Sequence, residues 1–257
     1  MSKPALNYRV EGEGRPLLLV HGFGIPFNIW KNLAPLLRPH FKLVMIELPG
    51  IGKSPMPAEG QDYTTAAIEG IDQVRQALGL QKWDVLGYSS GSRLAEAYVQ
   101  THAGHVCHAI FLCPVQISMP KARSMRLGLS LDHSMPAFGT WILSGWRLRF
   151  LISWLGFNLQ SDPRAGEWYA EIGAAPVRVL KETLRAMMPA AAGPFRVPVP
   201  YAMIWGEQDL VPETPRKPGP NDYFVHGRHA APMEAADEVA RIIIPFLEDQ
   251  RTTDAGK

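Results

Sequence analysis

Short, almost continuously apolar runs recur along the chain and predict β-strands. They are rich in branched aliphatic side chains, and an apolar run without alternation is typical of a strand covered on both faces. Such strands occur in sheets whose two surfaces are both packed against helices. The predicted strands cover residues 16–20, 42–48, 83–88, 108–113, 200–205 and 222–226.

Segments with helical periodicity separate several of these runs. One helix is predicted over residues 62–80, closed by Gly79 at its C-terminal end, and another over residues 233–249, with a kink at Pro245. Alternating strands and helices imply a mainly parallel sheet with helices on both sides, an α/β fold. The apolar face of the first helix consists of Ile68, Ile71, Val74 and Leu78, and that of the second of Val239, Ile242, Ile243 and Phe246.

The alternation stops between residues 117 and 196, where apolar helical material with several tryptophans replaces it. We therefore predict a core formed by residues 1–116 and 197–257, interrupted by a helical cap over residues 117–196. The most apolar part of the cap, residues 138–157, carries two arginines near its middle, so we do not expect it to span a membrane. Residues 118–160 carry an excess of positive charge. Their charged side chains are Lys121, Arg123, Arg126, Arg147 and Arg149, with Asp132 as the acidic one.

Composition narrows the class of protein. A chain of 257 residues can form one large α/β domain with an insertion. The formal net charge of +2 comes without a dense basic stripe, which argues against a nucleic-acid partner. The first fourteen residues lack the apolar segment of a signal peptide, so the sequence does not predict export.

The two cysteines, Cys107 and Cys113, both fall within one predicted strand. Six residues of strand separate them by roughly 20 Å. A disulfide requires Cα atoms within about 7 Å, so these two cannot pair with each other. We expect buried, reduced, structural thiols and a cytoplasmic location.

The segment "GYSSGS", residues 87–92, places three serines between the predicted strand over 83–88 and a helix predicted from "SRLAEAYVQ", residues 92–100. A nucleophile on such a sharp turn needs very small residues two positions before and two positions after it. Ser89 meets this requirement, because Gly87 and Gly91 flank it, whereas Ser90 and Ser92 do not. Ser89 is the predicted nucleophile.

Several further motifs accompany this turn, and together with it the chain resembles the α/β-hydrolase superfamily, in the form that carries a helical cap. The resemblance covers nearly the whole chain outside the cap. The segments that carry it are "LLLVHGFG" (17–24), "ELPGIGKS" (47–54), "GYSSG" (87–91), "MIWGEQD" (203–209) and "GRHAAPMEAADEVA" (227–240).

The resemblance implies a serine–histidine–acid triad in the chain order serine, acid, histidine. Asp209 is the expected acid, with Glu207 as the local alternative. His229 is the expected base because proline and glutamate follow it in the family pattern, and His226 is the alternative. The residue before His229 is Arg228 where the family usually has glycine, a departure that favours His226.

Two backbone N–H groups are expected to face the oxyanion that forms during attack. The N–H of Ser90, directly after the nucleophile, is one natural donor, and the resemblance implies the N–H of Phe23 as the second. Tyr88, Trp141 and Trp146 are the candidate residues of the substrate pocket.

These residues predict a cofactor-independent serine hydrolase that cleaves a carboxylic ester or a related acyl bond through an acyl-enzyme. Its partner would be a small-molecule ester or acyl substrate, and no metal or other cofactor is expected. A carbon–carbon bond hydrolase of ring-cleavage products would use the same triad, and a non-catalytic ligand-binding relative is the alternative from another class.

Overall fold

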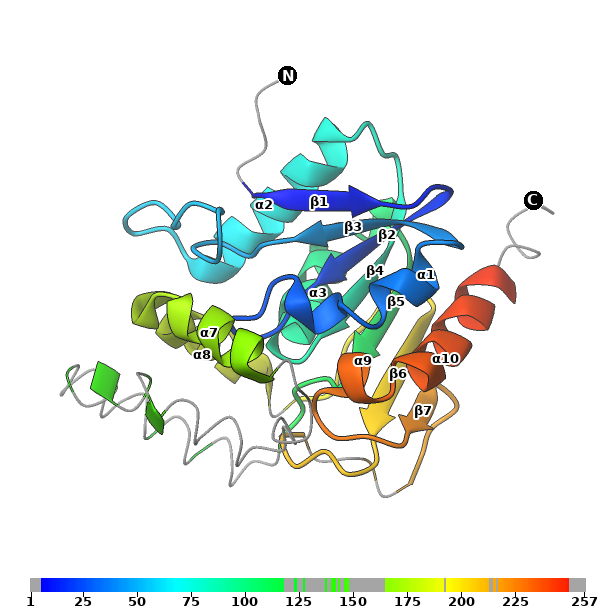
Figure 1. Ribbon diagram of the computed structural model, residues 1–257. Helices are drawn as coiled ribbons and strands as arrows, with labels where there is room; N and C mark the ends of the chain where they lie inside the picture. Colours follow the sequence, from blue (N-terminus) through cyan, green and yellow to red (C-terminus); the bar gives the residue numbers. More distant parts are fainter. Residues whose placement is uncertain are drawn as a thin grey trace.

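The computed structural model describes a seven-stranded, mainly parallel sheet in an α/β fold (Figure 1). The described residues are 6–117, 165–191, 193–212, 215 and 217–249, together with single positions at 123, 127, 137, 140, 141, 143, 146 and 147. The strand order is β1-β3-β2-β4-β5-β6-β7. The strands are β1 (Tyr8–Glu11), β2 (Arg15–Val20), β3 (Phe41–Ile46), β4 (Trp83–Tyr88), β5 (Val106–Leu112), β6 (Tyr201–Gly206) and β7 (Asp222–Val225).

All six strands predicted from apolar runs are confirmed, and they pair in parallel. The seventh, β1, pairs antiparallel with β3 at one edge of the sheet. It has four residues, two of them exposed, so it lacks the apolar run that marks the other strands. An edge strand beside solvent does not need that run.

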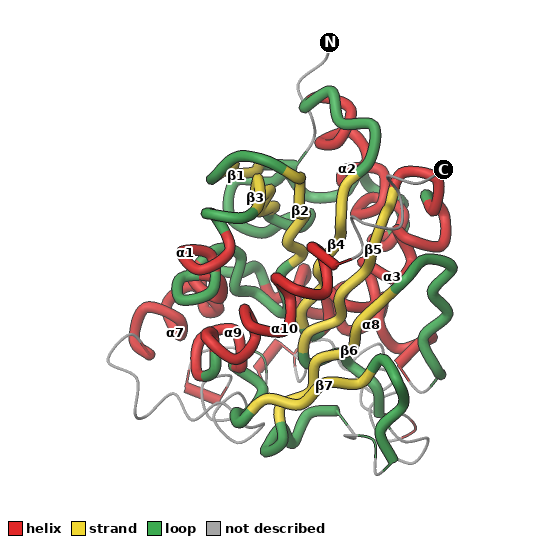
Figure 2. The backbone as a smooth tube through the Cα atoms, turned by 90° about the vertical axis from the view of Figure 1, so that its right-hand side faces the viewer, coloured by secondary structure: helices red, strands yellow, loops and turns green. Residues whose placement is uncertain are grey.

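Helices cover both faces of the sheet (Figure 2). On one side α2 packs against α3, and on the other α1 packs against α10. The described helices include η1 (Asn28–Trp30), α1 (Ala34–Leu37), α2 (Tyr63–Ala77), α3 (Ser90–Thr101), η2 (Ala103–His105), α7 (Ala165–Ala174), α8 (Val177–Ala191), α9 (Ala231–Glu234) and α10 (Ala236–Asp249).

The boundaries of α2, the helix predicted over residues 62–80, have local chemical causes. The side chain of Asp62 caps α2 by accepting the N–H of Thr65, and Gly79 follows the helix end with φ of +67°. The predicted helix over 233–249 is two helices, because α9 ends at Glu234 and α10 begins at Ala236. Pro245 lies inside α10.

Helices α7 and α8 lie between β5 and β6 in the chain, within the predicted cap. Helix α8 packs against α2 and α3, and α7 packs against η1. The division into core and cap stays a prediction, since residues 118–164 are described only at single positions. Most of residues 138–157 lies outside the described residues, and no helix that the structure describes is both long and apolar enough to cross a membrane.

Candidate active site

The turn between β4 and α3 forces Ser89 into an unusual backbone conformation, with φ of 52° and ψ of −126°. The turn is tight on both sides of the serine. A Cβ on Gly91 would come within 2.2 Å of the His21 carbonyl oxygen, and one on Gly87 within 2.6 Å of the Ala95 Cβ. The two glycines around Ser89 are therefore sterically required.

Ser89, His229 and Asp209 form a continuous chain of hydrogen bonds. The Oγ of Ser89 lies 2.6 Å from Nε2 of His229, and Nδ1 of His229 lies 2.7 Å from Oδ2 of Asp209. The second carboxylate oxygen of Asp209 accepts the N–H of Val211 at 2.9 Å. All three residues of the chain are buried.

The partners in these hydrogen bonds determine which atom donates the hydrogen and which accepts it. The ionised Asp209 can only accept, so Nδ1 of His229 carries the hydrogen and Nε2 is left with a lone pair. That lone pair faces the hydroxyl of Ser89, which donates to it. The arrangement can remove the proton from Ser89 as its oxygen attacks an electrophile.

The two alternatives considered from the sequence lie elsewhere. His226 and Glu207 face each other, with 3.4 Å between Nδ1 and Oε2, and their side chains are 72% and 54% exposed. They form a surface pair, whereas His229 and Asp209 are joined to the nucleophile by hydrogen bonds.

The loop carrying Gly22 and Phe23 passes directly beside the nucleophile. A Cβ on Gly22 would lie 2.8 Å from the Ser89 Cβ, so glycine is what allows this approach. Phe23 is half-buried against the core. Ser90 is the first residue of α3, so its N–H has no acceptor within the helix. The loop that carries Phe23 and the first turn of α3 thus both border Ser89, and the oxyanion role of the two N–H groups stays a prediction.

His21 fixes this loop. Its Nε2 accepts the N–H of Leu48 at 2.9 Å, so its Nδ1 carries the hydrogen and donates to the Gly22 carbonyl at 2.6 Å. Complete burial lowers the pKa of His21 to about 4, with the bond to Gly22 acting in the opposite direction. His21 is therefore neutral at pH 7, and it ties the loop after β2 to the loop after β3.

Cys113 lies beside the histidine and the acid, a contact that the sequence pattern does not predict. It follows β5 directly, in a left-handed conformation with φ of 44°. One ligating atom from each of Cys113, Asp209 and His229 lies within 4.8 Å of the others. Burial raises the thiol pKa well above its usual range, as does the neighbouring Asp209 carboxylate. The position of Cys113 directly after a predicted strand could have indicated this contact, because residues that directly follow parallel strands meet at one sheet edge.

A sulfur, an imidazole nitrogen and a carboxylate oxygen are also potential metal ligands. Here Nδ1 of His229 and Oδ2 of Asp209 are joined by their 2.7 Å hydrogen bond, which uses the atoms that a metal would need. The observed geometry is that of a triad with a thiol beside its acid.

The candidate pocket residues occupy two different environments. Tyr88 is buried, packs against Trp30, and donates its hydroxyl to the backbone carbonyl of His229 at 2.8 Å. Trp141 and Trp146 are 53% and 69% exposed, and the guanidinium of Arg147 lies near both rings. The pocket role of all three stays a prediction.

Comparison with known proteins places this geometry in context. Residues 15–140 match the family model described as alpha/beta hydrolase fold. Among curated proteins, the pimeloyl-[acyl-carrier protein] methyl ester esterase of Legionella pneumophila (strain Corby) is 33% identical over 76 residues. That match covers 30% of this chain and 30% of the relative, so the chain matches less than a third of that relative's length.

Two solved structures are similar over nearly the whole chain. A thermophilic esterase from Thermogutta terrifontis has a TM-score of 0.75 at 21% identity, covering 95% of this chain and 93% of its own. A meta-cleavage product hydrolase from Pseudomonas fluorescens IP01 has a TM-score of 0.73 at 18% identity, covering 95% and 94%. At these identities the likeness concerns the fold.

Proposed function

We propose that this chain, which has the fold of the α/β-hydrolase family, is a serine hydrolase that cleaves carboxylic esters through an acyl-enzyme. One observation carries the proposal. The strained Ser89 points its hydroxyl at His229, which in turn is held by Asp209, with successive distances of 2.6 and 2.7 Å.

The reaction follows from the direction of these hydrogen bonds. His229 accepts the proton of Ser89 through Nε2 while Oγ attacks the ester carbonyl carbon. The carbonyl oxygen becomes an oxyanion, which the N–H groups of Phe23 and Ser90 stabilise. His229 then gives its proton to the leaving alkoxide, the carbon–oxygen bond breaks, and the acyl group remains on Ser89.

Hydrolysis of the acyl-enzyme repeats these steps with water. His229 takes a proton from the water molecule as its oxygen attacks the acyl carbon. Collapse of the second oxyanion returns the proton to Oγ of Ser89 and releases the carboxylic acid. Asp209 stabilises the imidazolium in both halves of the reaction.

The substrate class follows from the predicted cap. Its apolar and basic residues favour an acyl or aromatic group of moderate size, with an anionic end. An esterase acting on a methyl ester of an acyl chain is among the relatives, which agrees with such a substrate.

A cytoplasmic location is part of the proposal. Both cysteines are free thiols, as is usual in the reducing cytoplasm.

The test combines turnover with covalent labelling. The wild-type chain should hydrolyse p-nitrophenyl butyrate, and a fluorophosphonate probe should label it at Ser89, located by peptide mapping. Ser89→Ala should lose both the labelling and essentially all turnover. Retained turnover in this variant, or a label on another residue, would contradict the proposal.

The same triad could instead cleave carbon–carbon bonds. A chromogenic dienoate ring-cleavage product, assayed beside the ester, separates the two reactions. The proposal requires that kcat/KM for the ester exceeds that for the dienoate.

A further inference from the structure

Helix α3 holds the chain at the point where it leaves the core after β5. Val115 has both of its backbone polar groups bonded to this helix. Its N–H donates to Oγ of Ser92 at 3.2 Å, and its carbonyl accepts from Nε of Arg93 at 2.8 Å. The hydroxyl of Ser92 also donates to the carbonyl of Ser89 at 2.5 Å. The exit is thereby tied to the nucleophile turn itself.

The same helix holds the chain where it returns to the core after α8. The Nη2 of Arg93 donates to the Gly193 carbonyl at 2.8 Å, and its guanidinium carbon lies 3.7 Å from the centre of the Phe195 ring. Oε1 of Glu96 accepts the N–H of Arg196 at 2.7 Å. A short, buried ion pair at 2.8 Å joins Arg93 to Glu96.

Arg93 and Glu96 are only 4% and 5% exposed. A buried guanidinium is expensive unless its donors are bonded, and here its three nitrogens each have an acceptor. A lysine could not replace this planar fork, because it presents a single donor group. The contacts therefore depend on arginine at this position.

The segment between β5 and β6, whose two ends α3 holds, packs against the loop that follows β2. Helix α8 ends two residues before Gly193 and packs against α3. In the loop that carries Gly22 and Phe23, a Cβ on Gly24 would lie 3.3 Å from Leu180 on α8 and 3.5 Å from Ile172 on α7. Displacing α8 would therefore alter the packing of this loop, which approaches Ser89 at Gly22.

We propose that Ser92, Arg93 and Glu96, the α3 clamp, are positioning residues that set substrate selectivity by fixing both ends of the segment between β5 and β6 against the nucleophile helix. The proposal rests on the proposed esterase function. It adds that Arg93 controls the binding of long acyl chains without taking part in the chemistry. Short acyl groups, which need only the triad and the oxyanion donors, are expected to be insensitive to it.

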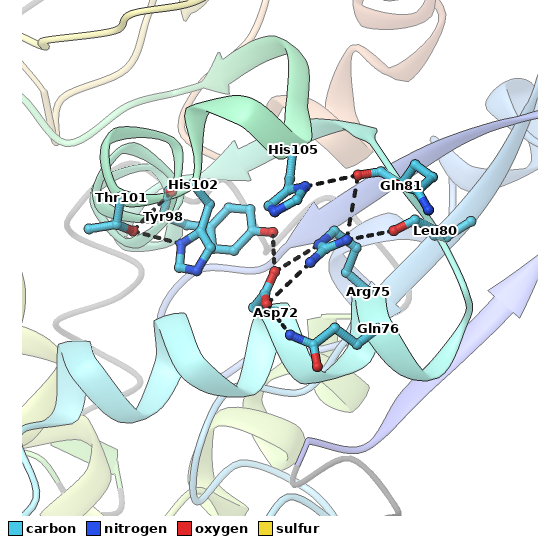
Figure 3. A network of polar contacts seen from close by, with 9 residues as sticks. All are labelled: Asp72, Arg75, Gln76, Leu80, Gln81, Tyr98, Thr101, His102 and His105. Carbon is cyan, nitrogen blue, oxygen red and sulfur yellow. Dashed lines mark hydrogen bonds and ion pairs between the residues drawn. The ribbon is translucent and has the colours of Figure 1, made fainter. Parts of the chain in front are cut away.

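The molecule offers a matched control on the same face of the sheet. Figure 3 shows Arg75 of α2 paired with Asp72, three residues away, with Nη1 of the arginine donating to the carbonyls of Leu80 and Gln81. Arg75 is buried like Arg93 and holds backbone carbonyls in the same way. These hydrogen bonds of Arg75 do not involve the segment between β5 and β6, so the control separates loss of a buried arginine from loss of the clamp.

The experiment compares Arg93→Met with Arg75→Met in the full chain. Methionine keeps an unbranched side chain and removes every donor. For each variant, kcat and KM are measured with p-nitrophenyl acetate and p-nitrophenyl octanoate. Hydrogen exchange is followed in peptides covering residues 114–117 and 193–197.

We expect Arg93→Met to lower kcat/KM for the octanoate roughly tenfold, mainly through KM, with the acetate changed less than about threefold. Exchange in both peptides should accelerate by about tenfold. Arg75→Met should leave the ratio of the two esters unchanged and should not accelerate these peptides selectively. Arg93→Lys, which keeps the charge beside Glu96, should shift both readouts in the same direction by a smaller amount, and it replaces Arg93→Met if that variant does not fold.

The proposal would be overturned by either of two results. One is the same ratio of kcat/KM for the octanoate and the acetate in the Arg93 and Arg75 variants. The other is unchanged hydrogen exchange in the two peptides of the Arg93 variants. Failure of the proposed function has a different signature: the wild-type chain would hydrolyse neither ester and Ser89 would not be labelled. In that case hydrogen exchange alone decides whether Arg93 holds the two segments.

Discussion

The hydroxyl of Tyr88 and the backbone carbonyl of His229 are joined by a buried hydrogen bond of 2.8 Å. Tyr88 ends β4 and directly precedes Ser89, while His229 lies in the loop between β7 and α9. The strand that leads into Ser89 thus also holds the loop of His229. The rings of the two residues lie 5.5 Å apart, so packing supports the same placement.

Removing this hydroxyl should slow catalysis. In Tyr88→Phe the His229 carbonyl loses its buried donor, which costs about 1–3 kcal/mol. Because the loop then has more freedom, kcat should fall about tenfold while KM changes little. Steady-state kinetics with p-nitrophenyl butyrate measures both.

Tyr98→Phe is the control for that variant. Its hydroxyl donates to Asp72 at 3.2 Å, in the network between α2 and α3 (Figure 3). Its loss should reduce the free energy of unfolding and leave kcat unchanged. An equal effect of both variants on kcat would mean that Tyr88 acts only through stability.

Asp209→Asn should keep the geometry and abolish most of the activity. An amide at this position can donate to Nδ1 of His229, which favours the tautomer whose Nε2 carries the hydrogen and cannot accept from Ser89. We expect kcat to fall by about 10⁴, with slower fluorophosphonate labelling. Glu207→Gln, at the exposed runner-up position, should behave as wild type, and a comparable loss there would reverse the assignment of the acid.

Acid should weaken the fold through His21. Its pKa is about 4 in the folded chain and 6.5 when unfolded, so between these values the unfolded chain binds more protons. Stability therefore falls as the pH drops from 6.5 towards 4, by about 2 kcal/mol between pH 7 and pH 5. Urea unfolding of wild type and His21→Asn at the two pH values tests this.

The asparagine variant should be less stable at pH 7, yet lose less stability on acidification, because it lacks the imidazole that binds a proton in the unfolded chain but not in the folded one. His226→Asn, at an exposed histidine, should keep the wild-type pH dependence. Parallel pH profiles for wild type and His21→Asn would show that His21 does not contribute.

Gly91→Ala should disrupt the nucleophile turn. The added Cβ would lie 2.2 Å from the His21 carbonyl oxygen and 2.8 Å from that of Val20, both backbone atoms that cannot move aside. We expect a loss of about 3 kcal/mol in the free energy of unfolding, with loss of activity. Gly104→Ala adds a Cβ with no heavy atom within 4 Å and should change stability by less than about 0.5 kcal/mol, as judged by urea unfolding.

Much of the fold could be predicted because burial on both faces leaves a strong signal. The run Leu17–Val20 is wholly buried, and its four apolar residues identify a central parallel strand from the sequence alone. Strand β1 gives no such signal, because hydrogen bonding to β3 rather than side-chain burial defines it. The break at Ala235 likewise leaves no mark, since Ala235 and the neighbouring Ala236 are residues that a continuous helix accommodates readily.

Within the candidate site, the flanking glycines indicated Ser89, and the resemblance to the family indicated Asp209 and His229 over Glu207 and His226. The contact of Tyr88 with His229 spans 141 residues of sequence, and only the folded sheet edge reveals it. Cys113 was expected to be a buried thiol, and it is buried, but its position beside Asp209 was not predicted. The contacts of Arg93 could not be predicted from the sequence either, since its acceptors at Val115 and Gly193 are backbone atoms with no sequence signature.

The backbone of Ser89 has a consequence beyond its reactivity. A non-glycine residue with φ of 52° and ψ of −126° is strained, and glycine would relieve that strain at this site. Ser89→Gly should therefore unfold at a higher temperature than Ser89→Ala, although both are inactive. The backbone conformation that the proposed nucleophile requires thus lowers thermal stability at residue 89, a local trade-off between stability and activity.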